Sequence, residues 1–180
     1  MNNKKQNKAV FLDRDGVINH VVFHSEVNKP SSPWKIEEFK IIEDISDPIE
    51  ELKKMGFLLF IISNQPDIAR GKIIPSTTDE INKIILSKFP IDEIVVCPHD
   101  DSDNCNCRKP KPGMIIDLSK KWNVNLEKSY LIGDSWKDIG AGKSAKIKSI
   151  LIEKKYNRDV DAEYRAADLK SAVELIRKQQ

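Results

Sequence analysis

Short apolar runs alternate with amphipathic stretches along most of this chain. The longest run, residues 57–62, is continuous and of strand length, which is typical of a strand buried on both faces of a sheet. Similar runs lie at residues 10–12, 94–96, 130–132 and 149–152. The pattern therefore predicts a series of buried strands separated by helices.

Helix signals fall between these runs. Asp47 as an N-cap and Pro48 after it predict a helix that ends at Gly56, and Thr77 with Glu80 predicts a second helix start. Apolar side chains recur at helical spacing in three stripes: Ile81, Ile84 and Ile85; Met114, Ile115, Leu118 and Trp122; Leu169, Val173 and Ile176. The alternation predicts an α/β fold, with a parallel sheet, right-handed crossovers and helices on both faces. In such sheets, ligands bind beyond the carboxyl ends of the strands.

Polar residues follow four of the predicted strands. These segments are Asp13-Arg14-Asp15-Gly16, Ser63-Asn64-Gln65, Cys97-Pro98-His99 and Gly133-Asp134. Each one alone is an ordinary turn or helix start, but four at successive strand ends indicate a site. Carboxylates from two strand ends suit Mg²⁺. One Asp can attack phosphorus, and a second acid two residues on can protonate the leaving oxygen. The pattern predicts phosphoryl transfer to a carboxylate.

All three cysteines lie between residues 97 and 107. Together with one histidine they supply three thiolates and an imidazole, from Cys97, His99, Cys105 and Cys107. This closed set is typical of structural Zn²⁺ and leaves no ligand position for a catalytic water. Arg108 and Lys109 follow directly, so a metal bound at Cys107 would fix the loop that directs both cations toward an anion.

Three acids lie inside this cysteine loop: Asp100, Asp101 and Asp103. They do not form an EF-hand calcium loop, because Cys105 and Lys111 occupy the positions at which that loop needs a glycine and an acid. We expect these three acids to be solvated loop residues.

The composition suits one globular domain over residues 1–180: the chain is 39% hydrophobic and 32% charged. Lys and Arg number 30 against 28 Asp and Glu, which gives no broad electrostatic case for nucleic acid. The N-terminal segment lacks the apolar core of a signal peptide, and no apolar run is long enough to span a bilayer. We expect a cytoplasmic protein without nucleic-acid or membrane partners. A monomer is favoured, although nothing in the sequence fixes the oligomeric state.

The order of the motifs resembles that of the haloacid dehalogenase (HAD) superfamily. The resemblance runs from residue 9 to about residue 152, through FLDRDGVIN at residues 11–19, Ser63, Lys109, and Gly133-Asp134 with Asp138. It implies a Rossmann-like three-layer sandwich with a parallel central sheet. By this resemblance, Asp13 is the nucleophile and Asp15 the general acid and base. Asp15 favours a phosphatase over a dehalogenase, because a phosphoester needs its leaving oxygen protonated.

The resemblance also implies a metal site. Asp134 would bind Mg²⁺ together with the carboxylate of Asp13 and the backbone carbonyl of Asp15. Asp138 either supports this site or is an acid on a helix surface.

A narrower resemblance comes from CPH at residues 97–99, CRKPKPGM at 107–114, SNQ at 63–65 and IARG at 68–71. These segments are similar to those of the D-glycero-D-manno-heptose 1,7-bisphosphate phosphatase and histidinol-phosphate phosphatase family. By that resemblance, Ser63 and Lys109 hold the transferring phosphoryl group, and Asn64, Gln65, Arg108 and Lys109 contact substrate. Pro66-Asp67 departs from the Ser-Gly that is common in the family, which leaves the sugar and its anomer open.

Such enzymes have no large cap domain, and only a flap, residues 17 to about 34, follows the first strand. Pro30 and Pro33 favour an extended loop there. His20 and His24 in the flap either contact substrate or are exposed loop residues. We assign no chemistry to the segment after Ile152.

The resemblance implies a Mg²⁺-dependent phosphomonoester hydrolase that works through a phosphoaspartyl intermediate and is stabilised by zinc. The implied reaction removes the C7 phosphate of D-glycero-D-manno-heptose 1,7-bisphosphate in nucleotide-activated heptose biosynthesis. The nearest alternative substrate is histidinol phosphate. A nucleic-acid 3′-phosphatase and a non-enzymatic zinc-binding module are further alternatives.

Overall fold

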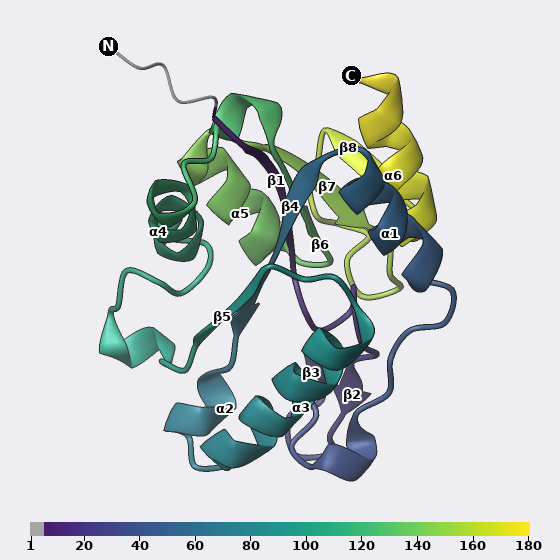
Figure 1. Ribbon diagram of the computed structural model, residues 1–180. Coiled ribbons are helices and arrows are strands. Elements are labelled where there is room, and N and C mark those ends of the chain that lie inside the picture. The colour runs from purple at the N-terminus through teal and green to yellow at the C-terminus, as the bar shows by residue number, and fades with distance from the viewer. Residues whose placement is uncertain (1–5) are drawn as a thin grey trace.

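A six-stranded parallel sheet forms the centre of the computed structural model, which describes residues 6–180 (Figure 1). The strand order is β5-β4-β1-β6-β7-β8. The bounds are β1 Lys8–Leu12, β4 Phe57–Asn64, β5 Glu93–Cys97, β6 Tyr130–Gly133, β7 Lys148–Ile152 and β8 Tyr164–Ala166. Every neighbouring pair runs parallel, so the carboxyl ends of β1, β4, β5 and β6 meet at one edge of the sheet.

All five predicted strands are present, each slightly longer than its apolar run. The sixth, β8, was not predicted, because Tyr164-Arg165-Ala166 alternates apolar and polar side chains over only three residues, which is too short to indicate a strand. Parallel pairing with β7 creates this strand, and Ile150 lies opposite Tyr164.

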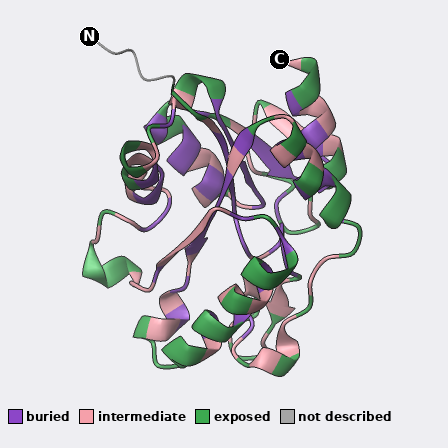
Figure 2. Ribbon diagram, in the orientation of Figure 1, coloured by how far each residue is buried: buried purple, intermediate pink, exposed green. Residues whose placement is uncertain are grey.

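Helices cover both faces of the sheet. On one face lie α1 (Ser46–Lys54), α3 (Pro75–Lys88) and α6 (Leu169–Lys178), and on the other α4 (Gly113–Lys121) and α5 (Trp136–Ala145). Side chains of β1 alternate between the two apolar cores: Val10 and Leu12 face the first, Ala9 and Phe11 the second. The central strands β1, β4 and β6 are therefore largely buried on both sides, whereas the edge strand β5 is only partly buried (Figure 2). The α/β three-layer fold expected from the sequence is confirmed.

Two helices begin earlier than predicted. Helix α1 begins at Ser46 with Ile45 as its N-cap, so Asp47 lies in the first turn rather than at the cap. Helix α3 begins at Pro75, since proline is favoured at the first helical position, and Thr77 is already inside the helix. Gly56 follows α1 with φ of 83°, as predicted for its end.

The flap contains a small antiparallel hairpin rather than only an extended loop. Its strands are β2 (Val22–Phe23) and β3 (Pro30–Ser31), and the 3₁₀ turn η1 (Ile36–Glu38) follows. The hairpin and the one-turn helix α2 (Pro66–Ala69) lie beyond the carboxyl edge of the sheet (Figure 1). Within residues 6–180 this edge carries no large cap domain.

The sequence predicts that the N-terminal segment is not a signal peptide. Residues 1–5 of that segment lie outside the described part of the chain. Among residues 6–180, none of the helices has the length and apolar character needed to cross a bilayer.

Candidate active site and metal centre

Three carboxylates meet at the carboxyl edge of the sheet. Asp13 follows β1, Asp134 follows the adjacent strand β6, and Asp138 lies in the first turn of α5. One oxygen from each lies within 4.8 Å of the others. Gly16 makes this approach possible, because its φ is 86° and a Cβ there would overlap the Asp134 carboxylate.

Lys109 joins this group from the loop before α4. Its Nζ lies 2.9 Å from Asp13 Oδ1 and 2.6 Å from Asp138 Oδ1, and it donates to the Ile62 carbonyl at 3.0 Å. Asp138 is fully buried and also accepts from the backbone N–H and the hydroxyl of Ser135. It is therefore not the helix-surface acid that the sequence left as one alternative.

The cluster carries more negative charge than Lys109 neutralises. Burial and the charge of Asp138 raise the pKa of Asp13 well above its ordinary value. Burial and Asp138 also raise the pKa of Asp134, to about 7. Crowded, buried oxygen donors of this kind suit a hard divalent cation such as Mg²⁺, whose charge would relieve their repulsion.

Asp15 has a different environment from its neighbours. Burial alone would raise its pKa, but the Arg14 guanidinium and hydrogen bonds from three side chains lower it below the ordinary value. Asn19 donates at 2.9 Å, Ser32 at 2.9 Å and Gln65 at 2.7 Å. Asp15 is therefore ionised in this arrangement, which is the form of a general base.

The residues after β4 support other members of the site. Ser63 is fully buried, and its hydroxyl accepts from Gln65 Nε2 at 2.7 Å. Asn64 makes two reciprocal hydrogen bonds with the backbone of Lys109, at 2.9 and 3.0 Å. Asn64 thus fixes the position of Lys109, and Gln65 links Ser63 to Asp15.

A pocket of about 300 Å³ opens above the carboxylates. Among the described residues, the sequence-predicted members of its lining are Asp13, Asp15, Asn64, Arg108, Lys109 and Asp134, whereas Ser63 and Gln65 are buried and do not line it. The lining also includes the flap residues Lys29 and Ser32, the segment residues Asp67 and Arg70, and five residues that the sequence did not indicate: Ser135, Trp136, Lys137, Tyr156 and Asn157.

The segment after Ile152, to which the sequence assigned no chemistry, takes part in the site. The Tyr156 hydroxyl donates to the Asp134 carboxylate. Asn157 Nδ2 donates to the backbone carbonyl of Asp134 at 2.7 Å and to that of Ile152 at 2.8 Å. No sequence pattern marks these two residues, because only the fold brings them to β6.

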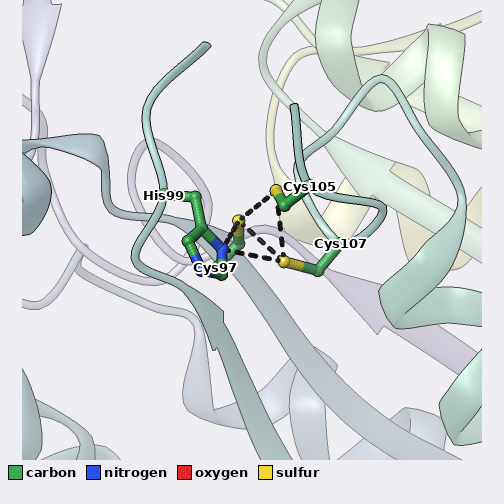
Figure 3. A group of neighbouring side chains, drawn as sticks. All are labelled: Cys97, His99, Cys105 and Cys107. Atoms are coloured by element: carbon green, nitrogen blue, oxygen red, sulfur yellow. Dashed lines mark hydrogen bonds between the residues drawn. The ribbon is translucent and has the colours of Figure 1, made fainter. Parts of the chain in front are cut away.

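The four predicted zinc ligands point toward one another (Figure 3). The Sγ atom of Cys107 lies 3.0 Å from that of Cys97 and 3.4 Å from that of Cys105, and His99 Nδ1 lies 3.3 Å from Cys107 Sγ. A tetrahedron around Zn²⁺ has edges of about 3.5–3.8 Å for such ligands, so these separations fit a metal after small adjustments. All three cysteines are free, and burial raises the pKa of the Cys97 thiol.

Two acids of the cysteine loop are ion-paired rather than merely solvated. Asp100 accepts two hydrogen bonds of 2.6 Å from Arg70, and Arg70 lowers the pKa of Asp100 to about 2. Asp101 accepts from Arg108 Nε at 2.7 Å, and the Arg108 guanidinium also donates to the His99 carbonyl at 3.3 Å. These pairs hold both arginines at the wall of the pocket.

Neither flap histidine lines the pocket. His20 lies 3.0 Å from Glu43 and is half exposed. His24 is not an exposed loop residue: it stacks on Trp34 with ring centroids 3.6 Å apart, and its side chain is only 9% exposed. The His24 side chain therefore packs within the flap, against Trp34, and does not line the pocket.

The site and fold have counterparts among known proteins. The sequence pattern of haloacid dehalogenase-like hydrolases matches residues 4–152. The chain belongs to the haloacid dehalogenase-like hydrolase family. The expected superfamily is thus confirmed, and so is the expected enzyme class, a phosphatase.

Two relatives indicate a narrower group within this family. The D-glycero-beta-D-manno-heptose-1,7-bisphosphate 7-phosphatase of Pasteurella multocida (strain Pm70) is 35% identical over 158 residues, with 82% of each chain covered. The protein of the same name from Escherichia coli (strain K12) is 34% identical, with 77% of this chain and 75% of that one covered. These similarities place the chain with the heptose bisphosphate branch that the cysteine loop indicates.

One solved structure is similar to this chain over almost its whole length. The D,D-heptose 1,7-bisphosphate phosphatase from B. bronchiseptica, complexed with magnesium and phosphate, superposes with a TM-score of 0.81. It is 25% identical, and the alignment covers 96% of this chain and 99% of that one. The relative's magnesium accords with the carboxylate cluster described above.

Proposed function

We propose that this chain removes the C7 phosphate of D-glycero-β-D-manno-heptose 1,7-bisphosphate, through a phosphoaspartyl intermediate on Asp13. The observation that carries the proposal is the convergence of Asp13, Asp134, Asp138 and Lys109 beside one pocket. The names of the relatives supply the sugar and its β anomer.

In the proposed first step, a carboxylate oxygen of Asp13 attacks phosphorus, and the bond from phosphorus to the C7 oxygen breaks. The ammonium of Lys109, already 2.9 Å from Asp13, holds a phosphoryl oxygen while negative charge shifts toward the leaving group. Mg²⁺, held by Asp13, Asp134 and the backbone carbonyl of Asp15, would supply the positive charge that lets an anionic nucleophile approach a phosphate.

Asp15 moves the protons in both steps. It gives a proton to the leaving C7 oxygen, and the resulting carboxylate then takes a proton from the water that attacks the aspartyl phosphate. Its hydrogen bonds from Asn19, Ser32 and Gln65 favour the ionised form required for the second step. The negative charge of a bound phosphate raises its pKa and favours the protonated form required for the first step.

We propose that the cysteine cluster binds Zn²⁺ and has a structural role. Its three thiolates and one imidazole complete a tetrahedral set. Cys107 is followed directly by Arg108, so a metal there would fix the wall of the pocket. We further propose that residues 1–180 form one domain that acts as a cytoplasmic monomer, with both apolar cores packed on a shared sheet.

The test is a phosphate-release screen, with Asp13→Asn as the inactive control and metal content measured on the same preparation. The substrates are both anomers of the heptose 1,7-bisphosphate, histidinol phosphate and a 3′-phosphorylated oligonucleotide. We expect the highest kcat/KM for the β-heptose bisphosphate. A higher value for histidinol phosphate or the oligonucleotide would replace the proposed substrate. No release from any phosphomonoester would favour a non-enzymatic zinc-binding module.

A further inference from the structure

The turn after β7 lies against the end of β6. Asn157 in this turn is buried, and its Nδ2 donates to the backbone carbonyls of Asp134 and Ile152. Its Oδ1 accepts from the backbone N–H of Lys154 at 2.9 Å, and the Asn157 N–H donates to the Lys154 carbonyl at 3.2 Å. The turn at residues 154–157 is therefore closed on itself and tied to the backbone that carries Asp134.

Tyr156 in the same turn contacts the Asp134 side chain. Its hydroxyl donates to Asp134 Oδ2. Asp134 is buried, whereas Tyr156 is 37% exposed and lines the pocket, so the ring reaches from solvent to a buried carboxylate. Gly16 leaves room for this contact, because a Cβ there would lie 3.1 Å from the Tyr156 hydroxyl oxygen. Asn157 thus holds the backbone of Asp134, and Tyr156 holds its carboxylate.

The flap contacts the ring of Tyr156. Phe23, the second residue of β2, packs against it with ring centroids 6.4 Å apart and an angle of 64° between the ring planes. Edge-to-face pairs at this separation are favourable for aromatic side chains. Phe23 is otherwise largely exposed. Tyr156 therefore joins the flap to the carboxylate at the end of β6.

The hydroxyl matters to Asp134 because this carboxylate lacks the partner that its neighbours share. Lys109 pairs with Asp13 and Asp138. Within residues 6–180, no cation pairs with Asp134, and the Tyr156 hydroxyl is the only side-chain donor to its carboxylate. A carboxylate has about four lone-pair positions, so one can hold the hydroxyl while others stay free for a cation. Donors of this kind orient metal ligands, and their loss lowers metal affinity.

We propose that Tyr156 is a positioning residue whose hydroxyl keeps the Asp134 carboxylate directed toward Asp13, where Mg²⁺ would bind, and that Phe23 of the flap holds its ring. This inference rests on the proposed function, because it takes Asp134 as a ligand of Mg²⁺. Tyr156 acts through Asp134 rather than on the phosphate. The flap and the metal site are thereby coupled. By linkage, bound Mg²⁺ favours the flap position in which Phe23 packs on Tyr156.

The test compares Mg²⁺ binding in variants of Tyr156 and Phe23. Tyr156→Phe removes the hydroxyl and keeps the ring, and calorimetry on substrate-free protein should show Mg²⁺ affinity lowered by about tenfold or more. Phe23→Ala should lower the affinity in the same direction but less, because the hydroxyl remains. Phosphate release by Tyr156→Phe should be reduced most at low Mg²⁺ and less as Mg²⁺ is raised. A purely structural defect would reduce it by the same factor at every Mg²⁺ concentration.

The matched control is Tyr130→Phe, the same change at the opposite end of β6 from Asp134, where the hydroxyl lies 3.5 Å from Gln179. It should leave Mg²⁺ affinity unchanged. Unchanged or tighter Mg²⁺ binding in Tyr156→Phe, or equal weakening in Tyr130→Phe, would overturn the positioning role. Unchanged binding in Phe23→Ala would overturn the part of the flap. Failure of the wild type to bind Mg²⁺ would instead overturn the proposed metal site, so the wild-type titration distinguishes the two failures.

Discussion

Arg70 donates two hydrogen bonds of 2.6 Å to the Asp100 carboxylate, one from Nε and one from a terminal nitrogen of the guanidinium. The pair joins the residue after α2 to the loop that carries the cysteine cluster. Arg70 also donates to Asp67 at 3.0 Å, and Asp67 accepts from the Trp34 indole at 2.9 Å. The flap, α2 and the cysteine loop are therefore connected side chain to side chain along one wall of the pocket.

Replacing Asp67 should break this connection. Asp67 is 6% exposed, so Asp67→Ala leaves the Trp34 indole N–H without its acceptor and Arg70 with one partner fewer. We expect a loss of about 1–3 kcal/mol in the free energy of unfolding, measured by urea denaturation. Asp67→Asn keeps an oxygen acceptor for the indole and should lose less. Equal stability of Asp67→Ala and the wild type would show that the connection contributes nothing.

Asp13→Asn should abolish turnover without unfolding the protein. The amide cannot form the aspartyl phosphate, so kcat should fall by about a thousandfold or more. Stability should not fall, because the substitution removes one of the mutually repelling charges and Lys109 keeps Asp138. Phosphate release and thermal unfolding measured on one sample test both expectations, and substantial residual turnover would contradict the proposed nucleophile.

We expect the stabilisation of the folded protein by Mg²⁺ to depend on pH. The pKa of Asp134 is raised from 3.8 to about 7, so in the metal-free protein the folded state binds more protons than the unfolded state between these values. The contribution of Asp134 to stability therefore falls as pH rises through this window. Mg²⁺ competes with the proton, so its stabilising effect should be larger at pH 8 than at pH 6.

Thermal unfolding with and without Mg²⁺ at the two pH values measures this difference. Calorimetry in two buffers of different ionisation enthalpy should also detect proton release on Mg²⁺ binding near pH 6. The matched variant is Asp134→Asn, in which the pH dependence of the Mg²⁺ effect should shrink. A Mg²⁺ effect that is independent of pH in the wild type would argue against a cation site at Asp134.

Removal of the zinc that we propose for the cysteine cluster should affect both stability and substrate binding. Chelation at Cys97, His99, Cys105 and Cys107 should lower the thermal midpoint by about 10 °C, which corresponds to about 3 kcal/mol for a chain of this length. Arg108 should lose its fixed position, since it follows Cys107 and donates to the His99 carbonyl. KM should therefore rise more than kcat falls. Unchanged activity and midpoint in metal-free protein would contradict a structural metal.

The sequence identified the groups that lie directly after strands. Asp13 and Asp134 follow apolar runs, and parallel strands bring their ends to one edge, so their convergence could be predicted. Tyr156 could not be predicted, because its position depends on how the segment after β7 returns across β6. The low pKa of Asp15 could not be predicted either, because it depends on donors from several segments, Ser32 of the flap among them.

The ion pairs in the pocket wall could not be predicted from the sequence either. Arg70 pairs with Asp100 across 30 positions of sequence, so no local pattern connects these two residues. Lys29 and Lys137 belong to segments whose local pattern is that of a solvated surface, and the fold alone brings both to one cavity.

The reciprocal hydrogen bonds between Asn64 and the backbone of Lys109 anchor the far end of the cysteine loop directly to the tip of β4. That anchor lies outside the span between His99 and Cys105. Residues can therefore be inserted into that span or deleted from it while the ammonium group stays in register with its acids. The position of Lys109, for which we propose a role in holding the phosphoryl group, is therefore independent of the length of this loop.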